Sequence, residues 1–246
     1  MREVIEREKS DANLLNIAAT LDSRMTDYRG PNLIKYIEPL LNQGSVLDVG
    51  CGNGYYMNIL KRKGFDVHGI EPSEGMINKA KEIFGDVDIR RGWAEDMIKV
   101  FKDEKFDNVI IIDVLEHIDD DNLILKHMNK LLRKGGVLAI AVPAYPSLFC
   151  KRDEMYGHYR RYNKTDLKHK VEKAGFKIIQ TRYWSALTLP LYALYSRLPI
   201  DMEKTYLEMR SKNGIANNML GWWFRNIENK VNFGFGVNLL CLAKKI

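Results

Sequence analysis

The segment with the clearest chemical pattern is a glycine-rich turn between a short apolar run and a helical pattern. It reads Asp48-Val49-Gly50-Cys51-Gly52-Asn53-Gly54, which places glycine at alternate positions. Glycine lets the chain turn tightly and lets a ligand approach the backbone, and the start of the following helix offers unpaired N–H groups. A strand, this turn and a helix together predict a nucleotide-type binding site.

Two acidic residues around the turn narrow the type of ligand. Glu71 follows the next apolar run, about twenty positions past Gly50, where a carboxylate can accept hydrogen bonds from both ribose hydroxyls. Asp48 precedes Gly50 inside the strand; an anion there repels a pyrophosphate but suits a ligand that carries an ammonium and a sulfonium. The spacing also differs from the Gly-x-Gly-x-x-Gly of dinucleotide enzymes, which argues against a nicotinamide-dependent oxidoreductase.

The elements that must position this site follow as alternating apolar runs and helical patterns, which is typical of βαβ units and a parallel sheet. We expect strands at 45–49, 65–70, 87–90, 106–112, 137–142, 176–183 and 237–244. We expect helices at 55–63, 74–84 after the cap residue Ser73, 122–133, 165–174 and 184–198, the third ended by Gly135-Gly136. The sequence therefore predicts an α/β fold with a doubly wound, mostly parallel seven-stranded sheet and helical additions at both ends.

Composition sets broad limits on the class of protein. The chain has 246 residues, of which 46% are hydrophobic, enough for one generous domain. The net charge of +6 permits an acidic substrate, a nucleic acid or an anionic membrane surface but demands none of them. The three cysteines, Cys51, Cys150 and Cys241, are far apart, so neither a disulfide framework nor a zinc knuckle is expected, and no metal site is predicted.

Two segments bear on location. Acidic residues interrupt the first nine positions, so a signal peptide is not expected and a cytoplasmic location is. The apolar run at 183–200 is short for a membrane span. Its interpretation stays open between core packing, a cover over the acceptor and a peripheral contact with a membrane.

Several motifs in the same order resemble the class I S-adenosylmethionine (SAM)-dependent methyltransferases, over about residues 24–180. Besides the turn, the matching segments are Ile70-Glu71-Pro72-Ser73, Gly92-Trp93-Ala94-Glu95-Asp96, Phe106-Asp107, Asp113-Val114-Leu115-Glu116-His117-Ile118 and Leu132-Arg133-Lys134-Gly135-Gly136. Leu115-Glu116-His117 and Tyr28-Arg29-Gly30-Pro31 are similar to the small-molecule branch that includes quinone-biosynthesis O-methyltransferases. The resemblance implies a Rossmann-like methyltransferase fold, SAM as the cofactor and a small-molecule or lipid-like acceptor.

The resemblance also implies a division of the chain and a set of cofactor contacts. Residues 1–42 are expected to form a helical cap, 43–182 the SAM-binding core, and 183–246 substrate-side helices with a last strand of the same sheet. The candidate cofactor-binding residues are Arg29, Asp48, Gly50, Cys51, Gly52, Glu71, Pro72, Trp93, Ala94, Glu95, Asp113 and Val114. Arg29, with Arg24 as the alternative, is the candidate for the SAM carboxylate. Many relatives carry an aspartate at the position of Trp93, so adenine is expected to meet the backbone of Trp93 and Ala94, or Glu95.

Methyl transfer from a sulfonium requires an aligned acceptor and, for a hydroxyl acceptor, a group that removes a proton. No Asn-Pro-Pro-Tyr motif stands at 113–116, which favours a hydroxyl, carboxyl or carbanion acceptor over an exocyclic base amine. His117 and His158 are the candidate bases, and Tyr145 and Arg161 are candidate acceptor-binding residues. The structural alternatives are that His117 supports the start of a helix or loop and that His158 and Arg161 belong to a surface loop.

Two other functions stay open from the sequence. One is a non-catalytic SAM-fold binding module, because the cofactor motifs do not test the acceptor site. The other is methylation of RNA or protein, which the basic charge allows; nucleic acid is not expected, because the basic residues are scattered rather than grouped with aromatic residues. The sequence predicts no oligomeric state.

Overall fold

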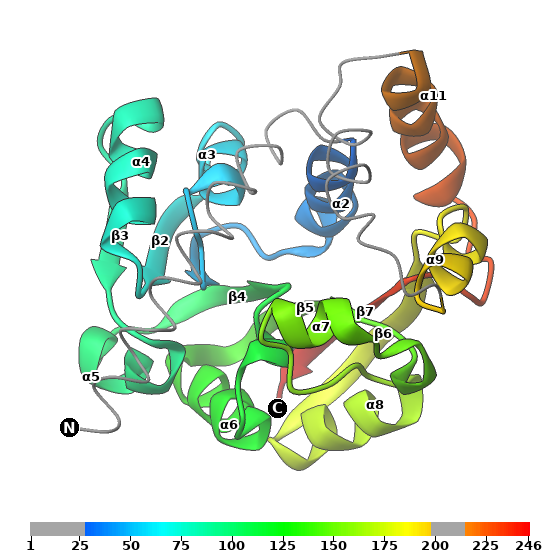
Figure 1. The fold of residues 1–246 in the computed structure, drawn as a ribbon. Helices are drawn as coiled ribbons and strands as arrows, with labels where there is room; N and C mark the ends of the chain where they lie inside the picture. Colours follow the sequence, from blue (N-terminus) through cyan, green and yellow to red (C-terminus); the bar gives the residue numbers. More distant parts are fainter. Residues whose placement is uncertain (1–27, 198–214) are drawn as a thin grey trace.

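The centre of the molecule is a seven-stranded sheet in the order β3-β2-β1-β4-β5-β7-β6 (Figure 1). The computed structural model describes residues 28–197 and 215–246. The strands are β1 (Ser45–Val49), β2 (Asp66–Glu71), β3 (Asp88–Arg91), β4 (Phe106–Ile112), β5 (Leu132–Pro143), β6 (Phe176–Trp184) and β7 (Asn238–Lys245). Strand β7 runs antiparallel to β5 and β6, and the other pairs are parallel, which confirms the predicted doubly wound, mostly parallel sheet.

Helices cover both faces of this sheet (Figure 1). One face carries α2 (Arg29–Ile37), α3 (Tyr55–Lys61) and α4 (Glu74–Phe84), and the other carries α5 (Met97–Phe101), α6 (Asp121–Leu131) and α8 (Lys164–Lys173). The remaining described helices are α7 (Lys151–Met155), α9 (Leu189–Tyr195) and α11 (Ile215–Trp223), with short turns at Glu38–Leu40, Ala94–Asp96, Leu115–His117, Pro146–Leu148 and Phe224–Glu228. Ser73 caps α4 as expected, since its Oγ accepts a hydrogen bond from Met76 N at 3.4 Å.

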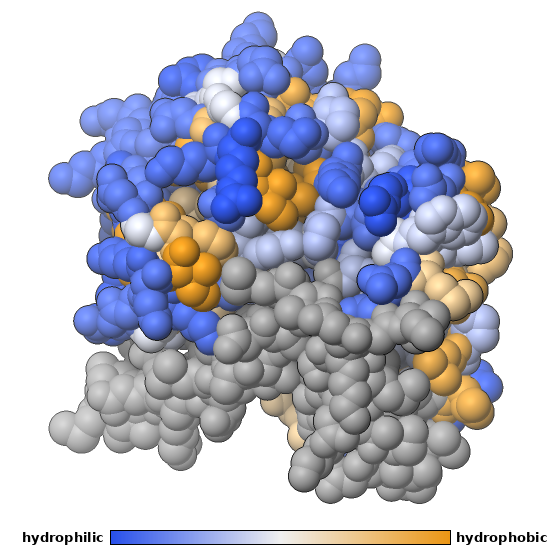
Figure 2. Space-filling view, turned by 90° about the horizontal axis from the view of Figure 1, so that it is seen from above, coloured by the Kyte–Doolittle hydropathy of each residue, from blue (hydrophilic) through white to orange (hydrophobic). Residues whose placement is uncertain are grey.

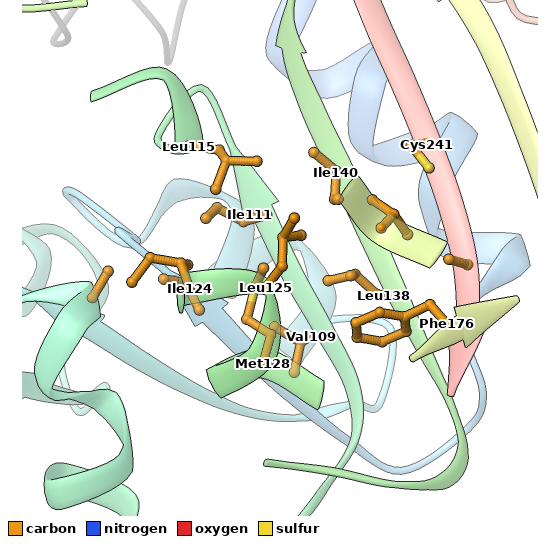
Figure 3. Packing of buried hydrophobic residues seen from close by; sticks show 14 of the residues in the cluster. Val109, Ile111, Leu115, Ile124, Leu125, Met128, Leu138, Ile140, Phe176 and Cys241 are labelled. Atoms are coloured by element: carbon orange, nitrogen blue, oxygen red, sulfur yellow. The ribbon is translucent and has the colours of Figure 1, made fainter. Parts of the chain in front are cut away.

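The hydrophobic core is divided in two by the sheet. Successive strand residues point to opposite faces, so Val109 and Ile111 of β4 join the cluster on the α6 side, and Ile110 joins the cluster under α2 and α3. Figure 3 shows the first cluster, where Leu125 and Met128 of α6 pack against β4 and β5. Because both faces are covered, the central strands β4 and β5 carry apolar residues on both faces, over 109–112 and 137–142.

The predicted end of the helix before β5 is wrong. Helix α6 ends at Leu131, the strand begins at Leu132, and Gly135-Gly136 lie inside β5. Residues 133–136 form an excursion in the strand, because Leu132 pairs with Phe106 of β4 and Val137 pairs with Asn108. A glycine that ends a helix and a glycine in such a bulge both meet the need for unusual backbone angles, so the sequence alone does not distinguish them.

The predicted helix at 184–198 is also wrong in its bounds. Strand β6 continues to Trp184, which is fully buried and pairs with Asn238 of β7. The chain then turns at Ser185, whose φ is 69°, and α9 begins only at Leu189. The helical segment at 215–228, made by α11 and Phe224–Glu228, was expected only in general terms, as part of the substrate-side helices in 183–246, and no bounds were predicted for it.

The ends of the predicted domain division fall partly outside the described residues. Of the expected N-terminal helical cap, the structure describes α2 and the turn at Glu38–Leu40; Arg24 lies outside the described residues. The last strand, β7, lies between β5 and β6 in the same sheet. Within the described parts of the chain, no helix has the length and apolar character needed to cross a membrane. The domain boundaries themselves stay a prediction.

Candidate cofactor and acceptor site

The predicted cofactor motifs meet at the carboxyl edge of the sheet, where β1 lies between β2 and β4. The strand order runs β1, β2, β3 to one side of this point and β4, β5 to the other, so the chain reverses its winding there. In open α/β sheets, ligands bind in the crevice at such a switch point. The glycine turn after β1, Glu71 at the end of β2 and Asp113 after β4 all lie at this edge.

The glycine turn is held against β2 by its backbone. The N–H groups of Gly50 and Cys51 donate to the carbonyl of Ile70 at 2.9 and 3.2 Å. Gly50 has a φ of 71°, and a Cβ at this position would lie 2.5 Å from Cγ2 of Val114. Only glycine therefore allows the turn to approach the segment after β4, which is where a cofactor contact by Val114 was predicted.

Glu71 is fixed at the same place by the loops around it. Its side chain is buried; Oε2 accepts a hydrogen bond from Gly52 N at 2.9 Å, and Oε1 accepts one from Ser73 N at 3.0 Å. Pro72 lies between Glu71 and Ser73 in the chain. The carboxylate thus joins the glycine turn to the start of α4, in the position expected for a ribose-binding acid.

Asp48 is the most unusual group of the site. It is 2% exposed, and Oδ2 has no hydrogen-bond partner within the described structure. Burial, and then the charge of Glu71, raise the pKa of Asp48 from 3.8 to about 8. A buried carboxylate without a partner is destabilised, and a cation placed beside it removes that cost. The buried carboxyl group of Asp48 therefore fits a ligand with an ammonium group, such as SAM. The neighbouring Cys51 is neutral, since burial raises the pKa of its thiol well above the ordinary value.

Arg29, the candidate for the SAM carboxylate, forms an ion pair across the site. Its Nη1 and Nη2 lie 2.7 and 2.9 Å from Oδ2 and Oδ1 of Asp113. Arg29 begins α2, and Asp113 directly follows β4. Two predicted cofactor residues are thus brought together from positions 84 apart in the chain.

The predicted adenine segment follows β3. Trp93 has extended backbone angles and is half-buried, Ala94 is buried at the start of a short helical turn, and the side chain of Glu95 is exposed. These positions place the backbone of Trp93 and Ala94 beside the end of the strand. Whether the backbone or Glu95 meets adenine stays a prediction.

The two predicted histidine bases lie against each other. The ring centroids of His117 and His158 are 4.5 Å apart, and the planes are nearly perpendicular. The two loops are joined by Tyr159 N, which donates to the carbonyl of Glu116 at 2.8 Å, and by Arg160 Nη1, which donates to the carbonyl of Ile118 at 2.6 Å. The tertiary fold therefore brings together two candidates that are far apart in the sequence.

Asp153 is a polar residue of this region that the sequence did not reveal. It is 1% exposed, and its Oδ1 lies 2.8 Å from Nδ1 of His158 and 2.9 Å from Nε of Arg161. Although burial acts to raise it, hydrogen bonds from His158 and Arg161 lower the pKa of Asp153 to about 2. With a carboxylate at Nδ1, the neutral His158 ring carries its proton there and leaves Nε2 as an acceptor.

The two predicted acceptor-binding residues make internal contacts. The side chain of Arg161 is 4% exposed, hydrogen-bonds to the Tyr192 hydroxyl, and lies 4.7 Å from the centre of that ring. Tyr145 stacks on Tyr183 with ring centroids 5.0 Å apart. Both residues help to fix the segment after β5, and their roles toward an acceptor stay predictions.

One group among the described residues has the spacing to hold a metal ion. Glu116, His117 and His158 each offer one atom, and these atoms lie within 4.8 Å of one another. The sequence led us to expect no metal here, and that expectation stays a prediction.

Comparison with known proteins identifies the family. A family model described as a methyltransferase domain matches residues 12–181. A ubiquinone biosynthesis O-methyltransferase from Azorhizobium caulinodans is 33% identical over 100 residues, 39% of this chain and 39% of that protein, and the chain matches about half the length of other curated relatives. A possible histamine N-methyltransferase structure from Thermotoga maritima superposes with a TM-score of 0.62 at 20% identity, covering 96% of this chain and 98% of that one. A phosphoethanolamine N-methyltransferase from Haemonchus contortus, in complex with SAM, gives 0.58 at 21% identity over 88% of this chain and 52% of that one. The predicted family, fold and cofactor are confirmed by these matches: the chain belongs to the methyltransferase-domain family and has the Rossmann-like fold of SAM-dependent methyltransferases.

Proposed function

We propose that this protein transfers a methyl group from SAM to an oxygen atom of a small-molecule or lipid-like acceptor. The observation that carries this proposal is that Asp48 of β1 has a buried oxygen without a partner among the described residues, while the rings of His117 and His158, on the loops after β4 and β5, lie in contact with each other. The first suits the ammonium of the cofactor, and the second suits removal of a proton from an acceptor.

The cofactor would be held by groups of known type around the glycine turn. In this assignment Glu71 accepts hydrogen bonds from the ribose hydroxyls, Asp48 faces the ammonium, and Arg29 faces the carboxylate. The backbone of Trp93 and Ala94 meets adenine. Bound SAM supplies the methyl group on a sulfonium; the protein aligns the acceptor and excludes water.

The proposed proton acceptor is Nε2 of His158. The carboxylate of Asp153 at Nδ1 fixes this tautomer, and the edge-on contact with His117 limits the rotation of the ring. A positioned base of this kind contributes a rate factor of roughly 10²–10⁴. Oxygen is favoured as the methylated atom by those curated relatives that are named as ubiquinone biosynthesis O-methyltransferases.

A lipid-like acceptor is supported by the surface around α9 and α11. Leu191 and Leu194 are each 59% exposed, Met219 is 66% exposed and Trp222 is 57% exposed. Figure 2 shows hydrophobic residues gathered toward the side of the molecule on which these helices lie. Such a surface suits the apolar part of an acceptor or a peripheral contact with a membrane. The expected cytoplasmic location stays a prediction.

The test separates binding from turnover. SAM affinity is measured by calorimetry, and methylation is measured with a panel of hydroxylated aromatic acceptors, with and without an isoprenoid tail, and their amine analogues. We expect His158→Ala to keep the SAM Kd within about twofold and to lower kcat by roughly 10²–10⁴. His169→Ala, an exposed histidine on α8, is the control and should change neither.

Other outcomes would redirect the proposal. Unchanged turnover in His158→Ala would remove its proton-accepting role. SAM binding without methylation of any small acceptor would leave a binding module or an enzyme acting on RNA or protein. We expect EDTA to leave turnover unchanged; a loss that added zinc or magnesium restores would show instead that the group of Glu116, His117 and His158 holds a metal.

A further inference from the structure

We propose that the exposed surface of α9 and α11 docks on a lipid bilayer that contains anionic lipids. The inference goes beyond the proposed methyl transfer, because it concerns a partner of the protein and not the reaction. The surface consists of five exposed apolar residues, which we call the apolar surface: Leu187, Leu191, Leu194, Met219 and Trp222. The first three lie just before and within α9, and the last two lie in α11.

The two helices repeat one pattern of exposed residues. Each presents two apolar residues and then an arginine in the turn that continues the helix, with a spacing of three positions. The two sets are Leu191, Leu194 and Arg197 and, in the second helix, Met219, Trp222 and Arg225. Residues three apart are neighbours on one side of a helix, so each set forms a stripe that ends in a cation. Leucine and tryptophan suit the boundary between headgroups and acyl chains, and an arginine beyond them suits the headgroup phosphates.

The charges of this region favour an anionic partner. Within the described ranges 185–197 and 215–237, the charged residues are Arg197, Arg225, Glu228 and Lys230. The three basic residues are exposed, whereas Glu228, the one acid of these ranges, is fully buried. An anionic bilayer offers both the negative potential and the apolar interior that such a surface matches. A second copy of the same surface would bring cations toward cations, which disfavours self-association.

The buried carboxylate of Glu228 joins the two helices. Its Oε1 accepts a hydrogen bond from Ala186 N at 3.0 Å, in the turn that leads into α9, and its Oε2 accepts one from Trp223 Nε1 at 3.1 Å, at the end of α11. The indole Nε1 of Trp184, at the end of β6, donates to Oδ1 of Asn229 at 2.9 Å. These bonds tie α9 and α11 to the same end of the sheet, where Figure 1 shows both helices. The apolar surface is thus held in place before it meets a bilayer, which lowers the entropic cost of docking.

The experiment is co-sedimentation of the whole chain with vesicles of phosphatidylcholine, with and without phosphatidylglycerol. We expect binding to the vesicles that contain phosphatidylglycerol, weaker binding to phosphatidylcholine alone, and a loss of affinity as the salt concentration rises. Trp222→Glu should lower the affinity for anionic vesicles by about tenfold or more, because it removes an apolar contact and adds a negative charge. Arg225→Gln should lower the affinity by about fivefold, because it removes one cation from the lipid surface.

Matched controls lie at the opposite end of the sheet. Ile83→Glu changes an exposed apolar residue of α4, and Arg62→Gln changes an exposed arginine at the end of α3. Both should bind vesicles as the wild type does, and SAM affinity should be unchanged in all four variants, which shows that they are folded.

Three results would overturn the proposal: equal binding to the two kinds of vesicle, no binding to anionic vesicles, or binding that Trp222→Glu leaves unchanged. Sedimentation velocity tests the other occupant. A dimer that Trp222→Glu dissociates, in a protein that binds no vesicles, would show that the apolar surface joins two copies of the chain instead. If the wild type binds anionic vesicles but not SAM, the proposed function fails and the docking surface stands.

Discussion

The cofactor side and the acceptor side of the site use their polar groups in different ways. Around the glycine turn, Glu71 bonds to backbone N–H groups, and an oxygen of Asp48 has no partner among the described residues. After β5, the polar side chains of Asp153, His158 and Arg161 satisfy one another. The first arrangement leaves a buried carboxyl group that a cationic ligand can match, and the second matches the charge of Asp153 within the chain.

This difference indicates which polar residues act on ligand binding and which act on the stability of the fold. A residue with an unmatched group acts mainly on ligand binding, because the ligand completes its interactions. A residue whose polar groups are all matched inside such a network, as those of Arg161 are, acts mainly on stability, because its removal leaves a buried partner unmatched. His158 gives only Nδ1 to the network, so its Nε2 can still take the proposed proton. Arg161 was expected to hold the acceptor, but its contacts are those of the second kind. The following experiments test this separation.

The largest effect is expected from Arg161→Met. The variant leaves the carboxylate of Asp153 buried with one charged partner fewer, so the free energy of unfolding should fall by about 3–5 kcal/mol, while SAM affinity stays unchanged. Urea unfolding and calorimetry measure the two quantities.

The control for this variant is Arg133→Met, which breaks an exposed pair with Asp107 and should cost about 1 kcal/mol or less. If a variant of Arg161 keeps its stability but no longer binds the acceptor, Arg161 does not act mainly on stability, and its predicted role in acceptor binding is supported instead.

A smaller effect is expected from Gly50→Ala, on the cofactor side. The added Cβ would meet Val114 at 2.5 Å, which should cost about 1–3 kcal/mol beyond the backbone strain and weaken SAM binding. Gly85→Ala is the matched control: its φ of 75° is close to the 71° of Gly50, but a Cβ there meets nothing within 4 Å. Equal effects of the two variants on stability and SAM affinity would show that backbone strain, not the close approach, sets the requirement for glycine.

The smallest expected effect is the release of a proton from Asp48 when SAM binds. Because its pKa is raised from 3.8 to about 8, the free native protein holds a proton there at neutral pH that the unfolded chain does not. The contribution of this group to stability therefore falls as the pH rises from 3.8 to about 8.

The ammonium of SAM favours the ionised form of Asp48, so SAM binding should release up to about one proton near pH 6–7. Calorimetry in buffers with different ionisation enthalpies measures this number. Asp48→Asn should release none. Proton release that is the same in wild type and Asp48→Asn would show that the ammonium does not lie beside this carboxylate.

The local patterns of the cofactor side were sufficient to predict most of its geometry. Alternating glycines after an apolar run predict a turn that only glycine can adopt. The structure agrees, because a Cβ at Gly50 would lie 2.5 Å from Cγ2 of Val114. Ser73 caps α4, and Glu71 ends β2, because these features depend on a few neighbouring residues and on the register of parallel strands.

The errors have a common physical origin. Gly135-Gly136 were assigned to a helix end, although they lie in a bulge of β5 that depends on pairing with β4. Trp184 was assigned to a helix, although its burial against Phe224 and its pairing with β7 extend the strand. In both places a partner from a distant part of the chain overrides the local preference.

The amino-acid sequence alone was enough to identify the family, the sheet and the cofactor turn, because each is encoded by residue types at short, regular spacing. The contact between His117 and His158, the closed network of Asp153 and the ion pair of Arg29 with Asp113 were decided only by the tertiary structure. Side chains from separate loops and helices meet in these contacts, and spacing along the chain carries no information about which distant charges come within hydrogen-bond distance.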